Sequence, residues 1–376
     1  FRMLSFTSAL TSLAADPEGH LLVVGSDAGC LHLVRAPGWR HAFVADTIRL
    51  SDAGVARVAV TFHDAGVGVL VVAALLFNNK IAFLRVHIEA EDPKLDMLGF
   101  VDVGGAIEDI CFHRAEFEGD DAKLLAAGAA DADGTSCVWL IAAPPIEYEA
   151  AVAELSRETC PVWSMKVDGS KKPENRISAV TSFSHDPREA VVVGFAGGAL
   201  KSFPAPTSFG ASAAKQAPAE AIEAFPPQGQ LITRVVLSED GRFLVSASMD
   251  GSVRRIPIEE GTKVPISHKL VHNPYNGGVA QVAVDPSGLL FLSTGGSDGA
   301  VVWSDPRDAV RPPAPGPEED AVEVPGDQEE LATSVDDKDT AAFPLWAPVD
   351  LADPDARAGE ENDDPQLNAI AMAQRR

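Results

Sequence analysis

Few residues in this sequence stand at spacings that would let them do chemistry together. The run Asp131-Ala132-Asp133-Gly134 is similar to part of a calcium-binding loop, but Ala129 stands where that loop needs its first acid, and no Glu follows at the last ligand position. Cys30 and His32 lie two residues apart on one predicted strand, yet no second pair follows at the spacing of a zinc site. The sequence therefore predicts neither a metal ion nor a cofactor.

Motifs of common enzyme classes give no catalytic site either. The sequence contains no H-E-x-x-H, P-loop or protein-kinase signature. Its glycine clusters, at 194–198 and 295–299, stand between predicted strands, whereas a phosphate-binding loop joins a strand to a helix. The nine histidines are scattered along the chain. We predict that the protein is not an enzyme.

The candidate functional residues are instead ones that bind proteins. Residues 143–176, which we call the insert, lie outside the repeated strand pattern described below. We interpret them as a long outer strand followed by a projecting loop. A second candidate is the apolar segment 343–346 in the C-terminal part of the chain. The predicted partner-binding residues in these two segments are Trp163, Lys166, Lys171, Lys172, Phe343 and Trp346. The alternative is that Trp163 packs against the flank of a neighbouring element and the lysines are merely solvated. On the first interpretation, deleting the insert leaves folding intact and weakens partner capture.

Charge and composition exclude some classes of partner. The formal net charge of −25 argues against nucleic-acid binding, which depends on clustered Lys and Arg. The longest apolar run, at 67–77, is shorter than the roughly 18 to 20 residues of a membrane-spanning helix. The four cysteines show no Cys-x-x-Cys spacing, so we expect free thiols in a reducing compartment. The sequence thus predicts a cytoplasmic protein with no nucleic-acid partner and no membrane insertion.

A repeated two-part pattern organises the first three hundred residues. An apolar strand, a tight turn and a second strand recur at 20–35, 71–86, 124–141, 191–203, 244–258 and 289–303. A shorter alternating strand and an acidic or Pro/Gly turn precede each copy. The tight turns fall near positions 29, 79, 134, 198, 251 and 299, which gives a period of 48 to 64 residues. This order of strands is that of a β-propeller blade.

These units resemble WD40 repeats over about residues 1–306. The resemblance rests on "SMDGSVRRI" and "GSDGAVVWSDP", where Trp303 takes the position of the family's closing Trp, as Trp139 does in "CVWLI". No repeat carries the Gly-His pair at the family's position, and the Trp-Asp dipeptide is absent. The resemblance implies an all-β, WD40-like β-propeller with six recognisable blades. A seventh blade would come from residues 143–176 or from sequence upstream of Phe1.

The composition changes after the last repeat. Residues 316–376 contain 17 acidic and 4 basic residues and several prolines, a composition typical of irregular chain. We therefore predict a propeller over 1–306, with an insert at about 143–176, and an acidic, Pro-rich tail or linker over 307–376 that leads into a helix.

The function implied by this organisation is that of a non-catalytic interaction scaffold, whose partners are other proteins of a multi-subunit complex. The layout is similar to that of cilia- and flagella-associated WD-repeat proteins, which implies an axonemal complex in the cilium or flagellum. A nuclear-pore or vesicle-coat scaffold is an alternative. The alternative of another class is an enzyme or small-ligand binder that uses the central channel. That function would need carboxylates or histidines on the inner strands, which we expect to be mostly Ala, Val, Ser and Thr.

Overall fold

The chain divides into two compact units, Phe1–Ala314 and Pro315–Arg376. All of the residues that the computed structural model describes belong to the first unit. They are residues 4, 6–16, 20–35, 42–64, 68–88, 90, 92–113, 122–130, 134–147, 154–168, 172–185, 188–206, 208–209, 217–238, 241–258, 267–284, 291–297 and 301–304. The predicted acidic tail, including Phe343 and Trp346, lies outside them.

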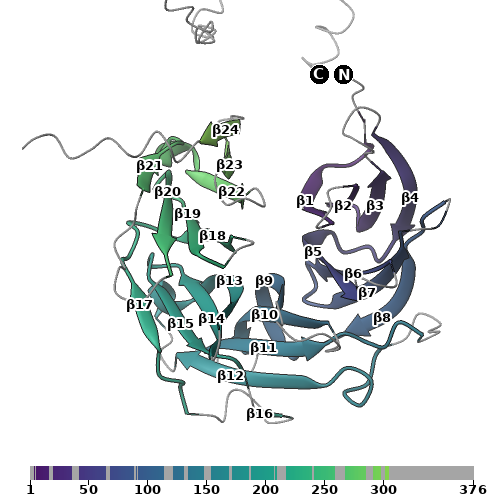
Figure 1. Cartoon of the computed structure of the whole chain (residues 1–376), viewed down its shortest axis with the longest axis horizontal. Helices are drawn as coiled ribbons and strands as arrows, with labels where there is room; N and C mark the ends of the chain where they lie inside the picture. Colours follow the sequence, from purple (N-terminus) through teal and green to yellow (C-terminus); the bar gives the residue numbers. More distant parts are fainter. Residues whose placement is uncertain are drawn as a thin grey trace, which may run out of the picture. The chain divides into compact units, whose positions relative to one another are not determined.

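The described residues form six antiparallel sheets, which we call blades 1 to 6 in chain order (Figure 1). Blade 1 contains β1 (Leu10–Ala15), β2 (Leu21–Ser26), β3 (Cys30–Arg35) and β4 (Phe43–Arg49). Blade 2 contains β5 (Val55–Asp64), β6 (Val69–Leu76), β7 (Ile81–His87) and β8 (Asp96–Val101). Blade 3 contains β9 (Gly105–His113), β10 (Lys123–Ala130), β11 (Ser136–Ala142) and β12 (Val162–Asp168), with β16 (Ser208–Phe209) added at its edge.

The remaining blades follow the same strand order. Blade 4 contains β13 (Ile177–His185), β14 (Arg188–Phe195), β15 (Leu200–Pro204) and β17 (Glu223–Phe225). Blade 5 contains β18 (Ile232–Leu237), β19 (Phe243–Ser248), β20 (Ser252–Pro257) and β21 (Ser267–Leu270). Blade 6 is described as β22 (Val279–Val284), β23 (Phe291–Gly295) and β24 (Val301–Ser304). Short 3-10 turns occur at η2 (Pro173–Asn175) and η4 (Pro274–Asn276). The predicted all-β propeller with six recognisable blades is confirmed.

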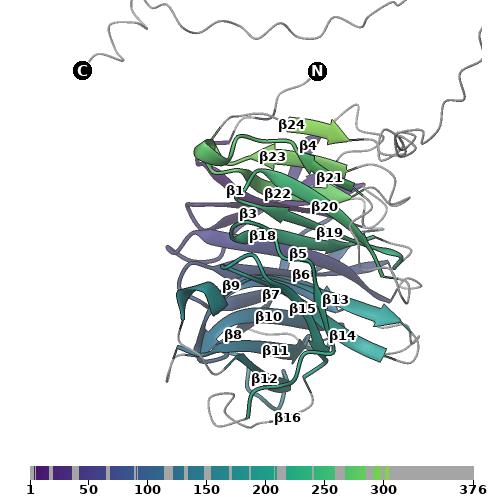
Figure 2. The same ribbon diagram turned by 90° about the vertical axis from the view of Figure 1, so that its left-hand side faces the viewer.

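Each blade packs face to face on the next one, as Figure 2 shows from the side of blades 4 and 5. Apolar clusters fill the spaces between consecutive blades: Leu31 and Leu33 of blade 1 pack with Leu70 of blade 2, for example. The second strand of a blade lies between two such clusters, and all eight residues of β6 are buried. The apolar strand that opens each repeat is therefore apolar on both faces because it lies between two blades. No helix in the described part of the chain is long and apolar enough to cross a membrane.

The tight turns between the second and third strands lie where the repeats predicted them. Gly29, Gly198 and Gly251 have φ values of 74°, 82° and 83°, which glycine adopts without a steric penalty. Asn79 takes the same place in blade 2 with a φ of 65°. Asparagine tolerates this left-handed conformation better than other residues that carry a Cβ. The turn residues are therefore set by backbone geometry.

The insert at 143–176 contains the predicted outer strand, since β12 completes blade 3. Its other described residues do not form a seventh blade, and those around Glu154 and Leu155 lie along blade 2. Leu155 donates its N–H to the carbonyl of Phe100 in β8, and Lys80 forms an ion pair with Glu154 at 2.5 Å. Leu155 and Cys160 are buried in the apolar cluster between blades 2 and 3. Deleting the insert would remove β12 and expose this cluster, so the structure leads us to expect that the deletion impairs folding.

Candidate functional site: the central channel

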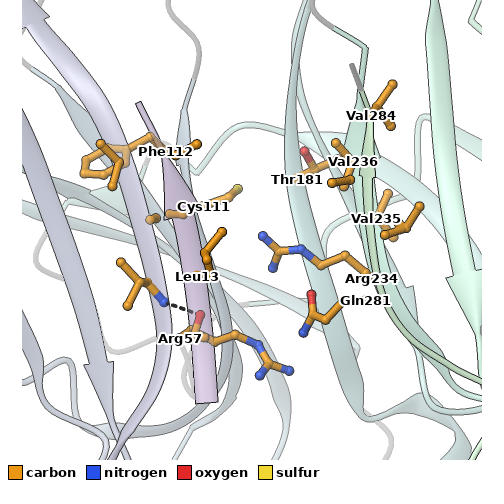
Figure 3. A pocket seen from close by; sticks show the side chains of 18 of the residues that line it. Leu13, Arg57, Cys111, Phe112, Thr181, Arg234, Val235, Val236, Gln281 and Val284 are labelled. Atoms are coloured by element: carbon orange, nitrogen blue, oxygen red, sulfur yellow. Dashed lines mark hydrogen bonds between the residues drawn. The ribbon is translucent and has the colours of Figure 1, made fainter. Parts of the chain in front are cut away.

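The first strands of all six blades line one cavity of about 670 Å³, which we call the central channel (Figure 3). The first strand is the innermost one of each blade in Figure 1. Residues from all six first strands line this common space.

Residues 295–299, GGSDG, match the G-x-S-x-G pattern of a nucleophile elbow. The segment nevertheless joins the antiparallel strands β23 and β24, whereas a nucleophile elbow joins a strand to a helix.

A β-bulge recurs near the start of every first strand, and it aligns the six blades residue by residue. In β5, for example, Val55 pairs with Leu76 and Arg57 pairs with Leu75, so Ala56 is the extra residue. A bulge turns the side chains that follow it, which places the next residue of each blade at the same level of the channel. These equivalent residues are Ser12, Arg57, Asp109, Ala179, Arg234 and Gln281.

Three of the equivalent residues form a charged cluster that joins four blades. Asp109 is buried, with a side chain only 1% exposed. Its Oδ1 accepts a hydrogen bond from Nη1 of Arg234 at 2.6 Å and lies 3.5 Å from Nε of Arg57. Its Oδ2 accepts the backbone N–H of Val180 at 3.0 Å. One carboxylate of blade 3 thus holds groups from blades 2, 4 and 5.

Charge in the channel is opposite in sign to that of the whole chain. Among the described lining residues, the charged side chains are Arg57 and Arg234, which both reach Asp109 and whose side chains extend into the same space in Figure 3. Asp109 neutralises one of these two positive charges, so the cluster keeps a net charge of about +1. Guanidinium groups remain charged at all physiological pH values. The channel can therefore attract an anion.

The apolar part of the channel wall is exposed on blade 1. Leu13 follows the bulge position by one residue and is 59% exposed. The equivalent residues of the other blades are buried, with exposed fractions of at most 5%, because each packs on the preceding blade: Val58, Ile110, Val180, Val235 and Val282. Leu10, on the other side of the bulge, is 48% exposed. Blade 1 thus exposes, beside the cavity, an apolar face that packs on the preceding blade in the other five blades.

The predicted partner-binding residues lie elsewhere. Trp163 is partly buried in β12, where it packs on the apolar cluster between blades 3 and 4 and pairs with Phe209 of β16. Lys166 lies three residues further along β12, and its carbonyl accepts the N–H of Ala219. Lys172 is exposed at the start of η2. Lys171, Phe343 and Trp346 lie outside the described residues. A partner-binding role for these residues stays a prediction.

Sequence reasoning missed the charged cluster, because it expected Ala, Val, Ser and Thr on the inner strands. A signal was present: Arg57, Asp109 and Arg234 each place a charged residue among the apolar residues of a predicted inner strand. In the described part of the chain, no group of three or more His, Cys, Asp and Glu side chains is placed to hold a metal ion. The four cysteines are free thiols: Cys137 and Cys160 are buried, and Cys30 and Cys111 are partly exposed.

Comparison with known proteins agrees with this architecture. The family model "WD domain, G-beta repeat" matches residues 222–255, from the last strand of blade 4 through the third strand of blade 5. A search of curated proteins found no match. One similar solved structure is a chain of the mitotic checkpoint complex, with 11% identity over 80% of this chain and 75% of that chain and a TM-score of 0.52. Another is Chaetomium thermophilum Sqt1 bound to the N-terminus of the ribosomal protein L10, with 15% identity over 80% and 85% of the two chains and a TM-score of 0.52. At these identities the likeness shows the fold, a WD40-like β-propeller.

Proposed function

We propose that the protein is a non-catalytic scaffold that binds other proteins of a multi-subunit complex through its central channel. The observation that carries this proposal is the channel wall itself, where two arginines and an exposed apolar surface on Leu10 and Leu13 lie in one cavity. Exposed apolar surface beside fixed polar groups is typical of binding sites. The fold is consistent with the proposal, since Sqt1 has the same architecture and binds the N-terminus of another protein.

A photo-crosslinking experiment tests the proposal. A photoreactive amino acid replaces Leu13 in the full chain, which is expressed in its source cells. The matched control carries the same amino acid at Tyr275, which is 95% exposed in η4 and does not line the channel. We expect a discrete protein adduct from position 13 and none of the same mass from position 275. Failure to form a protein adduct at position 13 would contradict the proposal.

The cavity volume favours a second candidate, a small-molecule binder, because about 670 Å³ lies in the range of ordinary ligand pockets. A thermal-shift screen against metabolites separates the two candidates. An increase in melting temperature with one compound, lost in the variant Leu13→Arg, would favour the small-molecule function over the scaffold.

The identity of the complex is a finer proposal. An axonemal complex of the cilium or flagellum is supported by the layout of the sequence alone, and a nuclear-pore or vesicle-coat complex fits the same layout. Trp163, Lys166, Lys171, Lys172, Phe343 and Trp346 are proposed as additional partner contacts. Fluorescent tagging of the full chain in its source cells distinguishes these locations. Signal confined to the cytoplasm outside cilia would exclude the axonemal proposal.

A further inference from the structure

The charged cluster in the channel is unbalanced, because two guanidinium groups share one carboxylate. Both oxygens of Asp109 are already used: Oδ1 faces Arg57 and Arg234, and Oδ2 accepts the N–H of Val180. The carboxylate therefore cannot also form a two-point, bidentate pair with Arg57. A complete pairing of Arg57 and Arg234 requires a second anionic group.

The contacts of Arg57 show where that group would bind. Its Nε is buried without a hydrogen-bond partner, since the 3.5 Å separation from Asp109 Oδ1 is an ion pair without a hydrogen bond. Its Nη1 donates to the backbone carbonyl of Ala56 at 3.1 Å. Arg234, in contrast, is bonded to Asp109 at 2.6 Å. Arginine donates through five N–H groups in a planar fork that matches the two oxygens of a carboxylate. The free capacity of the cluster thus lies mainly on Arg57.

The surroundings of the cluster favour a carboxylate carried by a polypeptide over a small inorganic anion. The same cavity is lined by Leu10, Leu13, Phe112, Val236 and Val284. Leu10 and Leu13 are 48% and 59% exposed to solvent. An inorganic anion would leave these side chains in water, whereas an acidic residue with apolar neighbours would cover them. Gln281 and Thr181 add neutral hydrogen-bonding groups to the wall (Figure 3).

We propose that the central channel binds an acidic segment of a partner protein, in which a Glu or Asp carboxylate pairs with Arg57 and Arg234 and an adjacent large apolar side chain packs on Leu10 and Leu13. This inference rests on the proposed scaffold function and names the chemistry of the partner. Charge complementarity supports it, because a net positive channel in a chain of net charge −25 concentrates attraction for a carboxylate at one place. The interaction weakens as salt concentration rises.

Short fluorescent peptides test the proposal on the full chain. The probe is a Gly/Ser heptapeptide with Leu-Glu-Leu at its centre, and its controls carry Leu-Gln-Leu or Ser-Glu-Ser. In 150 mM salt we expect the Leu-Glu-Leu peptide to bind roughly tenfold more tightly than either control, as charge-assisted hydrogen bonds and apolar burial both predict. Equal binding of Leu-Glu-Leu and Leu-Gln-Leu would overturn the carboxylate site. Equal displacement of the probe by inorganic phosphate at the same concentration would show a free-anion site and would overturn the peptide proposal.

Arg57→Gln is the decisive variant, because Asp109 keeps its 2.6 Å bond to Arg234 when Arg57 is replaced. We expect this variant to lose the preference for Glu over Gln in the probe. The matched control is Arg49→Gln, which removes an arginine paired with Asp52 on the outer strand of blade 1. Retention of the preference in Arg57→Gln would overturn the proposal.

The alkylation rates of two cysteines in the unmutated chain provide a test that does not depend on whether Arg57→Gln folds. Cys111 lines the channel, whereas Cys30 lies on the third strand of blade 1. Bound Leu-Glu-Leu peptide should slow the alkylation of Cys111 and leave that of Cys30 unchanged; equal rates with and without peptide would contradict channel binding. If Cys111 reacts slowly before any peptide is added, and 1 M salt speeds its alkylation, an acidic segment of this same chain occupies the channel. That result would overturn the proposal of a partner protein. If the peptides fail while the Leu13 crosslink to a protein persists, the scaffold function stands and the acidic specificity falls.

Discussion

The substitution Asp109→Asn should destabilise the propeller strongly. The carboxylate accepts from Arg234 at 2.6 Å and from the N–H of Val180 at 3.0 Å and lies 3.5 Å from Arg57. An amide of the same shape has one oxygen and one NH₂ group, so a donor must face either Arg234 or Val180. The two arginines also lose the one negative charge that they share.

The magnitude follows from burial. Removing one partner of a buried ion pair costs about 3–5 kcal/mol, and the guanidinium side chains of Arg57 and Arg234 remain 29% and 21% exposed. Water therefore replaces part of the lost interaction, and we expect a loss near the lower limit, about 3 kcal/mol. For a domain of about 300 residues such a loss lowers the melting temperature by roughly 5 °C, because the unfolding entropy that divides it grows with chain length.

Thermal melting and urea denaturation at pH 7 measure the effect. The matched control is Asp52→Asn, which removes a carboxylate bonded to Arg49 at a comparable 2.7 Å but 96% exposed. Because water solvates this pair, the control should melt like the unmutated protein. If Asp109→Asn also melted within about 1 °C of the unmutated protein, the cluster would not stabilise the fold as argued.

Three further substitutions or measurements test other parts of the structure. Gly194→Ala should lower the free energy of unfolding by about 1–3 kcal/mol in urea denaturation, because its Cβ would lie 2.6 Å from the side chain of Ile232 in β18. The control Gly229→Ala, whose Cβ would lie 3.3 Å from its nearest atom, should have a far smaller effect. Equal losses would contradict this account of blade packing. Burial acts to raise the pKa of Asp250, but hydrogen bonds from Ser252, Gly229 and Ser248 outweigh it and hold the pKa below its ordinary value of 3.8. The stability that the ionised carboxylate contributes is then present above about pH 4 and lost as the pH falls further, so the melting-temperature advantage over Asp250→Asn should shrink between pH 5 and pH 3 and not grow. Burial raises the pKa of Cys160 to about 12, so iodoacetamide at pH 8 should modify Cys111 and leave Cys160 intact in peptide mass spectra; modification of both at one rate would show that the insert opens.

The turns and buried strands could be predicted from the sequence because they depend on local chemistry. A glycine or asparagine with positive φ at 29, 79, 198 and 251 is required by the backbone of a tight turn wherever the blade lies. The apolar run of β6 is buried because a strand between two blades has no polar face. Each of these features leaves a mark within a few adjacent residues.

The insert could not be predicted in the same way. Leu155 and Cys160 carry no local signal that they pack between blades 2 and 3, and Trp163 is as compatible with a binding surface as with a packed flank. The position of Leu155 depends on its backbone hydrogen bond to Phe100 in β8, more than fifty residues earlier in the sequence, and Trp163 lies between β11 and β16 of blade 3. Contacts at such separations have no periodic pattern that a single sequence displays.

The sequence alone thus determined the repeat, the all-β architecture and the turn chemistry, since each rests on the spacing of residues close together in the chain. The tertiary structure alone decided that Arg57, Asp109 and Arg234 meet, because three bulges at equivalent places in blades 2, 3 and 5 bring residues up to 177 positions apart to one level of the channel. It also decided that Leu13 is exposed while its counterparts are buried, since burial there depends on the preceding blade and not on the residue.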